Sequence, residues 1–350
     1  MVTIGIDSHK SSLAVSLVDE LGRELASEQF GNDAGAHEAL YAWVRARAPG
    51  ERCFGIESTG WIGRGIACLL LERGERVVDV RGTLTERERK RLRGDGKSDT
   101  RDALAIARVS VREELPPVRV DSPSRDLKLL CDYRTQLVGE RTRIANRLHV
   151  DLVSLHPGYE RRVPRLTSGV RLEAAEEILA GDSGVQATLA RRRIEGLRRI
   201  DLELADVRRE IEAKVRASGT GLVRLVGISH LSAARIIGEV GDVARIATKD
   251  RFARMNGTAP IPASSGQTQR HRLNKGGNRR LNHAIHMMAL TQARMDPRAR
   301  AYVERRRGEG RTYRDAVRAL KRHLSDAVYR QLREDADRAT RRCTPGVALT

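Results

Sequence analysis

Aromatic residues are scarce in this sequence: Phe, Trp and Tyr make up 3% of its 350 residues. This scarcity argues against a protein that stacks single-stranded nucleic acid on aromatic rings. The four cysteines show neither a CxxC pair nor a histidine at zinc-ligand spacing, which argues against a zinc site and against structural disulfides. No apolar run approaches the roughly 20 residues of a membrane span, and no signal-peptide pattern opens the chain. We therefore expect a cytoplasmic protein with no membrane partner.

Acidic residues are outnumbered, and unevenly so. The chain holds 65 Lys and Arg against 46 Asp and Glu, a formal net charge of +19 with a pI of about 10.7. This excess points to a polyanion as partner, and the predominance of Arg favours planar contacts with phosphates. Residues 1–60 reverse the balance, with five basic residues against nine acidic ones. An acidic segment repels a polyanion, and bound metal ions are the obvious way to offset this repulsion.

The N-terminal part predicts an α/β domain of the ribonuclease-H-like class over residues 1–117. Three short β-branched or alternating runs are followed by a helix, a strand, a helix and a strand, which is the element order of that fold. The expected strands are Val2–Asp7, Ser12–Val18, Glu24–Phe30, Cys53–Glu57 and Val77–Val80, and the expected helices are Ala34–Arg47 and Ile62–Arg73. Residues 81–97 are basic and poorly periodic, so we expect a loop there, before a helix that Ser98 caps.

The rest of the chain is predicted to be mainly helical. In the middle region, 118–218, apolar residues recur at helical spacing over 124–155 and 185–215. Such helices suit either a coiled-coil hairpin that dimerises the protein or a pair of solvated packing helices. A mainly α C-terminal domain, 219–342, opens with a helix-hairpin-helix-like pattern over 225–241, whose turn amides suit a DNA phosphate.

Four carboxylates form the first candidate site. Asp7 and Glu57 each end a predicted strand, and Asp99 and Asp102 share one face of a predicted helix. Four converging oxygen donors suit two Mg²⁺ ions that clamp the attacking and leaving oxygens of a phosphodiester. Taken alone, Asp99 and Asp102 are also explained as acidic residues that interact favourably with the dipole at a helix N-terminus. The strand-end acids in an acidic segment of a basic protein favour the metal site.

A basic, serine-bearing segment forms the second candidate site. Residues 251–295 contain eight Lys or Arg and no acidic residue, which predicts a phosphate-binding surface. The candidate nucleic-acid contacts are Arg270, Arg272, Lys275, Asn278 and Arg279. Ser264 and Ser265 lie beside them, and a serine in such a setting could attack phosphorus. The alternative is an ordinary Ser-Gly turn next to a DNA-binding helix.

These motifs together resemble one family, the DEDD transposases of insertion sequence 110 and its relatives. The resemblance covers nearly the whole chain in the right order. The matching motifs are Gly5-Ile-Asp7-Ser-His-Lys10, Gly55-Ile-Glu57-Ser-Thr-Gly60, Lys97-Ser-Asp99-Thr-Arg-Asp102-Ala103, Gly238-Glu-Val-Gly-Asp242, Gly257-Thr-Ala-Pro260 with Ser264-Ser265-Gly266, and Lys275-Gly-Gly-Asn278-Arg279.

The resemblance implies a fold, an activity and a set of partners. The first domain would be similar to Holliday-junction resolvases of the RuvC type, and Asp7, Glu57, Asp99 and Asp102 would bind Mg²⁺. A serine directly before glycine, Ser265 with Ser264 as the fallback, would form a covalent phosphoserine intermediate with DNA. A structured bridge RNA would pair with target and donor DNA, and the protein would act as a dimer or tetramer, associated with the prokaryotic nucleoid. His9 and Lys10 match the family pattern and are assigned no chemical role.

Two other functions compete with an RNA-guided recombinase. A structure-selective endonuclease would use the four acids with water as nucleophile, and it would not need the serines. A nucleic-acid scaffold protein would need neither Mg²⁺ nor strand breakage.

Overall fold

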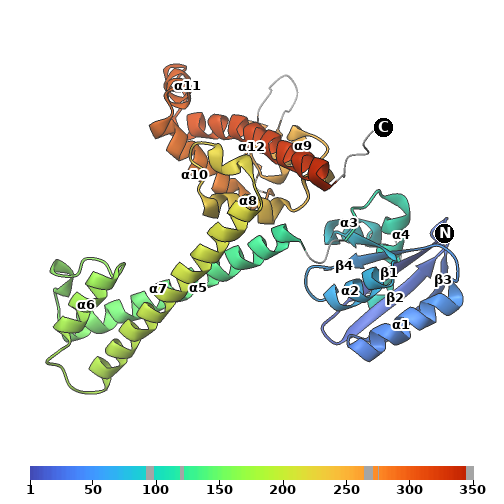
Figure 1. Cartoon of the computed structure of the whole chain (residues 1–350), viewed down its shortest axis with the longest axis horizontal. Helices are drawn as coiled ribbons and strands as arrows, with labels where there is room; N and C mark the ends of the chain where they lie inside the picture. The colour runs from blue at the N-terminus through green and yellow to red at the C-terminus, as the bar shows by residue number, and fades with distance from the viewer. Residues whose placement is uncertain (92–97, 119–121, 264–270, 275, 344–350) are drawn as a thin grey trace, which may run out of the picture. The chain divides into compact units, whose positions relative to one another are not determined.

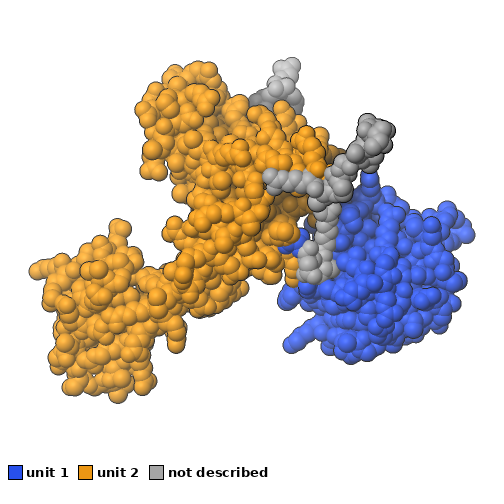
Figure 2. All heavy atoms as spheres, in the orientation of Figure 1, with its two compact units in different colours: residues 1–122 blue, residues 123–350 orange. Residues whose placement is uncertain are grey.

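The computed structural model describes residues 1–91, 98–118, 122–263, 271–274 and 276–343. The chain forms two compact units, 1–122 and 123–350, which Figure 2 colours separately. The three-way division of the chain by function stays a prediction. Within the described ranges, no helix combines the length and apolar character needed to cross a membrane.

The first unit is built on one mixed, five-stranded sheet (Figure 1). Its spatial order is β3-β2-β1-β4-β5; the β3-β2-β1 side is antiparallel, and β4 and β5 continue parallel to β1. The strands are β1 (Val2–Ser8), β2 (Ser12–Val18), β3 (Glu24–Gly31), β4 (Arg52–Glu57) and β5 (Arg76–Val80). The predicted strands and their ribonuclease-H-like order are therefore confirmed.

Helices cover both faces of this sheet, so its central strands are buried on both sides, with large apolar residues on one face and mostly small residues on the other. Ile4 and Ile6 of β1 point to one face and pack in a core with α1 (Ala34–Arg47) and α2 (Arg64–Glu72). The opposite face meets α4 (Asp99–Arg112), which runs across β1, β2 and β4. The predicted helix after Ser98 is confirmed, with Ser98 as its N-cap.

Two glycines let α4 lie directly against the sheet. Gly5 and Gly55 are neighbours across β1 and β4. A Cβ at Gly5 would lie 2.1 Å from the Ala103 carbonyl oxygen and 2.4 Å from the Ala107 nitrogen, both backbone atoms of α4. A Cβ at Gly55 would lie 1.9 Å from the Ser110 hydroxyl. The glycines thus fix how closely the start of α4, with its acids, approaches the end of β1.

Replacing Gly5 by alanine is expected to destabilise the first unit by about 2–4 kcal/mol. The new Cβ would clash with backbone atoms of α4, which cannot move aside as the end of a flexible side chain can. Gly50→Ala is the matched control, since a Cβ there would meet nothing within 4 Å. Urea unfolding followed by circular dichroism measures both changes. Equal stability of the two variants would contradict this account of the packing.

The prediction of a loop over 81–97 is wrong for the first half of this segment. Residues Gly82–Arg89 form helix α3, packed on α4, while 92–97 lie outside the described residues. The helix lacks an apolar period because its buried positions are Thr85 and Glu88. Glu88 is tolerated there because Arg112 of α4 donates to both of its carboxylate oxygens at 2.7 and 2.8 Å.

The second unit begins with a long helical hairpin, as predicted. Helices α5 (Pro123–Leu155) and α7 (Val185–Ala217) pack side by side (Figure 1). The hairpin tip carries α6 (Gly169–Ile178), which no sequence pattern predicted, and a small core of its own around Leu148, Leu172 and Ile194. A role of the hairpin in dimerisation stays a prediction.

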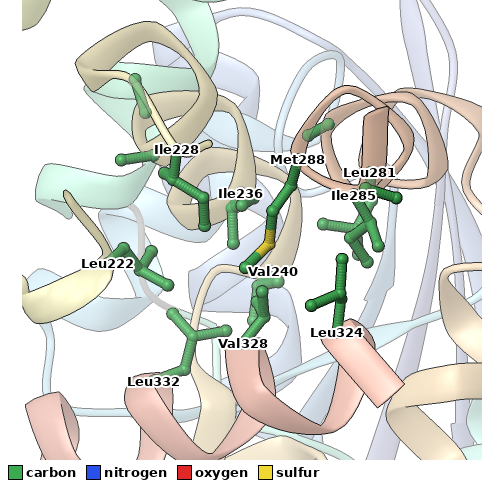
Figure 3. Packing of buried hydrophobic residues seen from close by; sticks show 14 of the residues in the cluster. Leu222, Ile228, Ile236, Val240, Leu281, Ile285, Met288, Leu324, Val328 and Leu332 are labelled. Atoms are coloured by element: carbon green, nitrogen blue, oxygen red, sulfur yellow. The ribbon is translucent and has the colours of Figure 1, made fainter. Parts of the chain in front are cut away.

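The base of the hairpin shares a larger core with the C-terminal helices. Figure 3 shows the part of this core that the C-terminal helices form. These helices are α8 (His230–Val240), α9 (Lys249–Met255), α10 (Arg279–Met295), α11 (Pro297–Gly308) and α12 (Tyr313–Cys343). Two short strands, β6 (Ile261–Pro262) and β7 (His271–Arg272), pair beside them. The expected helix-hairpin-helix consists of one 3₁₀ turn, Gly221–Arg224, a turn with Gly227 at φ 87°, and α8. Phosphate binding at that turn stays a prediction.

Candidate metal centre

The end of β1 and the start of α4 bring two carboxylates and one imidazole together. His9 Nε2 lies 3.2 Å from Asp7 Oδ2 and 3.2 Å from Asp99 Oδ1. One ligand atom from each of the three residues falls within 4.8 Å of the others. Asp99 is held at the first position of α4, where the Ser98 hydroxyl accepts a hydrogen bond from the Arg101 amide. We call these three residues the Asp7–His9–Asp99 cluster.

The donor set of this cluster fits a divalent cation. His9 Nε2 is enclosed and forms no hydrogen bond with a described residue, although two carboxylates flank it. An enclosed polar atom without a hydrogen bond is costly unless something else occupies its lone pair. Carboxylate oxygens suit Mg²⁺ and Mn²⁺, and imidazole is a common ligand of transition metals. A cation among these three groups would satisfy all of them.

The other two predicted acids lie close to the cluster. Burial raises the pKa of Asp7 above its usual value; His9 opposes this rise, and the negative charges of Asp102, Glu57 and Asp99 add to it. The concentration of negative charge is a cost that a bound cation relieves. The structure therefore gathers the four predicted carboxylates at one end of the sheet, with Asp7 and Asp99 inside the cluster and Asp102 and Glu57 within electrostatic reach of Asp7.

Asp102 and Glu57 are each held by the chain around them. Asp102 is buried and accepts hydrogen bonds from Arg89 Nη1 on both of its oxygens at 3.2 Å. Glu57 lies against the start of α3, where a Cβ on Gly82 would come within 2.6 Å of its Oε1. The next residue, Ser58, has a φ of 62°, an unfavourable value for a residue other than glycine. The backbone thus makes a sharp turn immediately after Glu57.

Two residues of the site were not assigned from the sequence. His9 had no chemical role there, although its place two residues after Asp7 was the available signal. Arg89 belonged to the expected loop, and only the packing of α3 on α4 brings it to Asp102. A histidine after a strand and an arginine in a basic run are too common to be singled out by spacing.

The predicted serine and nucleic-acid residues are described only in part. Ser264, Ser265, Arg270 and Lys275 lie outside the described residues. Arg272 is exposed on β7.

Two of the predicted contacts lie at the start of α10. Asn278 caps this helix, accepting from the amides of Arg280 and Leu281 while its own amide donates to Glu239 at 2.6 Å. Arg279 is exposed and lines a cavity of about 840 Å³ between α10 and α12. Nucleic-acid contacts at these positions stay predictions.

Two sequence families match this chain. Residues 4–157 match the DEDD transposases of the IS110 type, described as "Transposase", and residues 220–304 match the "Transposase IS116/IS110/IS902 family". The chain belongs to the IS110 family of DEDD transposases. This transposase is therefore a DNA-processing enzyme, and the sequence-based assignment to this family is confirmed.

Similar proteins come from insertion elements and cover nearly the whole length of the transposase. The 42 kDa protein of IS900 from Mycobacterium paratuberculosis is 26% identical, over 96% of both chains. The 44.8 kDa protein of IS116 from Streptomyces clavuligerus is 26% identical, over 95% of both. Among solved structures, Thermus thermophilus RuvC in complex with a Holliday junction substrate is similar at 19% identity, covering 34% of this chain and 99% of RuvC with a TM-score of 0.28. A glucokinase from Streptomyces griseus is similar at 15% identity over 51% of this chain and 76% of its own, with a TM-score of 0.21.

Proposed function

We propose that this transposase cuts and rejoins DNA strands under the guidance of a structured RNA, with two Mg²⁺ ions at its acidic site and Ser265 as nucleophile. The observation that carries the metal-dependent part is the Asp7–His9–Asp99 cluster, whose three ligand atoms lie within 4.8 Å of one another. The membership in a DNA-processing family supplies the substrate class. Asp102 and Glu57 supply the remaining carboxylates.

The acidic residues have separable tasks in this proposal. Asp7, Asp99, Asp102 and Glu57 would hold the cations, which stabilise developing charge on a phosphodiester when they are bound. His9 Nε2, which lies 3.2 Å from both Asp7 Oδ2 and Asp99 Oδ1, would supply a nitrogen ligand. Arg89 fixes the orientation of the buried Asp102 through the two hydrogen bonds it donates.

The serine would conserve the energy of the phosphodiester. Its oxygen would form a bond to phosphorus while the bond from phosphorus to the leaving DNA oxygen breaks. The hydroxyl proton would pass to solvent, and the leaving oxygen would take one up. Attack by the hydroxyl of another strand would reverse these changes, so that rejoining needs no external energy source.

Removal of the metal should abolish strand cleavage while leaving DNA binding intact. We expect EDTA to lower the cleavage rate by about a thousandfold or more, since metal stabilisation of the transition state is worth several kcal/mol. Added Mg²⁺ should restore the rate, and gel-shift titrations in EDTA should show unchanged affinity for DNA. Full cleavage in EDTA would overturn the proposed role of the acids and favour a different chemistry.

Replacing His9 should weaken the metal site directly. Loss of a group that merely orients a ligand costs about 10–100-fold in metal affinity, so His9→Ala should lose at least about tenfold. Isothermal titration with Mn²⁺ measures this affinity. His323→Ala, a histidine of the second unit that contacts Tyr302, is the control and should bind as the wild type does. Wild-type affinity in His9→Ala would remove His9 from the site.

Guidance by RNA and self-association are tested separately from the chemistry. Protein stripped of nucleic acid should cut DNA poorly and without site preference. Transcripts of the DNA that flanks the gene should restore cutting at defined sites. Light scattering of the complex would show a dimer or tetramer. If stripped protein cuts junction-shaped DNA unaided and leaves free ends, a structure-selective endonuclease is the better function.

A further inference from the structure

The cavity between α10 and α12 is lined by basic, uncharged polar and apolar residues. Five residues of α10 and five of α12 contribute, with the remaining walls formed by 257–258, 273–274 and 277. Its basic members are Arg279, His283, His286, Arg314, Arg318 and Lys321. None of the described residues that line it is acidic. A cavity of about 840 Å³ with such walls has the size and the charge for an anionic organic group rather than a bare ion.

Lys321 stands out among these basic residues. Its ammonium donates a hydrogen bond to Asn282 Oδ1 at 2.6 Å, and among the described residues no carboxylate pairs with it. Burial, with the positive charge of Arg318, lowers its pKa. Arg318, by contrast, donates to Asp315 at 2.8 Å. A partly buried ammonium without a negative partner favours an anion from outside the chain.

The chain positions Lys321 through a line of polar side chains. Asn282 donates to the carbonyl oxygen of Asn256 at 2.7 Å, and the side-chain amide of buried Asn256 donates to the Ser325 hydroxyl at 2.8 Å. The acceptor that Asn282 offers to Lys321 is thereby fixed. Apolar residues of α10 and α12, among them Leu281, Ile285 and Leu324, pack in the core (Figure 3). Val317 of α12 belongs both to this core and to the wall of the cavity.

The apolar part of the wall distinguishes a nucleotide from a bare phosphate. Leu273, Leu290 and Tyr313 line the same cavity as Lys321, and Leu273 and Tyr313 are exposed. A nucleotide has both parts: a phosphate that an ammonium pairs with, and a flat base that packs on apolar and aromatic surface.

We propose that the cavity between α10 and α12 binds one nucleotide of a DNA strand, with its phosphate at Lys321 and its base against the apolar wall. The proposal rests on the proposed function only in assuming that the bound nucleic acid is DNA. It does not depend on the metal or on Ser265. It makes Lys321 a binding residue of α12, a helix in which the sequence singled out no functional residue.

The test measures binding in EDTA, so that failure of the proposed chemistry cannot affect it. Fluorescence anisotropy of a short labelled DNA strand is followed with the full chain and with Lys321→Met, Lys321→Arg and Lys249→Met. Lys249 begins α9, is exposed and does not line the cavity, so its loss controls for net charge. Lys321→Met should bind about tenfold more weakly or worse, as expected for a lost charge-assisted hydrogen bond. Its log–log salt slope should fall by about 0.7. Lys321→Arg should retain most of the affinity.

A second variant asks whether the base enters the cavity. Leu273→Ala removes part of the apolar wall without changing a charge, and it should weaken binding by severalfold while the salt slope stays unchanged. Thermal melting verifies that each variant is folded.

Three outcomes would overturn the proposal. Wild-type affinity in Lys321→Met excludes the phosphate contact. Equal weakening by Lys249→Met shows only diffuse attraction to the basic unit. Weakened binding of an RNA strand of the same sequence, with DNA binding intact, assigns the cavity to the RNA instead.

Discussion

The Asp7→Asn protein is expected to bind DNA as tightly as the wild type and to lose strand cleavage by at least about three orders of magnitude. Asparagine keeps the shape of the side chain and removes the charge that a cation needs. Asp7 is the central carboxylate because it contacts His9 and because the negative charges of the other three acids all act on it. DNA affinity should survive, since it comes from the basic remainder of the chain.

The matched control is Asp19→Asn in the same unit. The Asp19 carboxylate accepts hydrogen bonds from the amides of Leu21 and Arg23 in the β2–β3 turn, and an asparagine can accept the same bonds. Single-turnover cleavage of labelled DNA compares the two variants. The same assay applied to Asp102→Ala and Glu57→Ala assigns the two outer acids: near-normal rates in either variant would remove that residue from the site.

Replacing Ser265 by alanine is expected to eliminate a covalent DNA–protein adduct completely. If the serine attacks phosphorus, reactions stopped in denaturant should contain DNA that migrates with the protein. The substitution removes the proposed attacking oxygen and changes none of the proposed metal ligands, so Mn²⁺ binding in Ser265→Ala should equal that of the wild type.

Ser264→Ala is the natural control for this experiment because the two serines are adjacent. It should form the adduct. An adduct that persists in Ser265→Ala and vanishes in Ser264→Ala would move the assignment by one residue. Cleavage by the wild type without any adduct would instead establish water as the nucleophile.

The sheet was predictable from the sequence because its strands are short β-branched or alternating runs separated by clear turns. Ser12–Val18 and Glu24–Phe30 were expected almost at the observed bounds, and Ser98 marked the start of α4. The two long helices were predictable for the same reason, as each repeats an apolar spacing over 33 residues. These elements owe their character to local patterns.

The features that the sequence did not reveal depend on packing between distant residues. Helix α3 buries Glu88 against Arg112, and a buried carboxylate at a core-facing position leaves no apolar period to detect. His9 enters the candidate site because α4 carries Asp99 to it, and that approach depends on two glycines in neighbouring strands. The cavity at Lys321 combines residues from three separate stretches of chain, none of which forms a motif alone.

The hairpin of α5 and α7 has a mechanical consequence. Each helix has 33 residues, so the hairpin is a rod of about 50 Å with a separate small core at its tip. Such a rod acts as a lever: a tilt of 10° at its base carries the tip through about 9 Å, more than two nucleotide spacings along a DNA duplex. Removing two turns from both helices would draw the tip in by about 10 Å while preserving which sides of the helices face each other. The length of the hairpin therefore sets the distance from its base to its tip, and this distance can be changed in steps of whole helical turns.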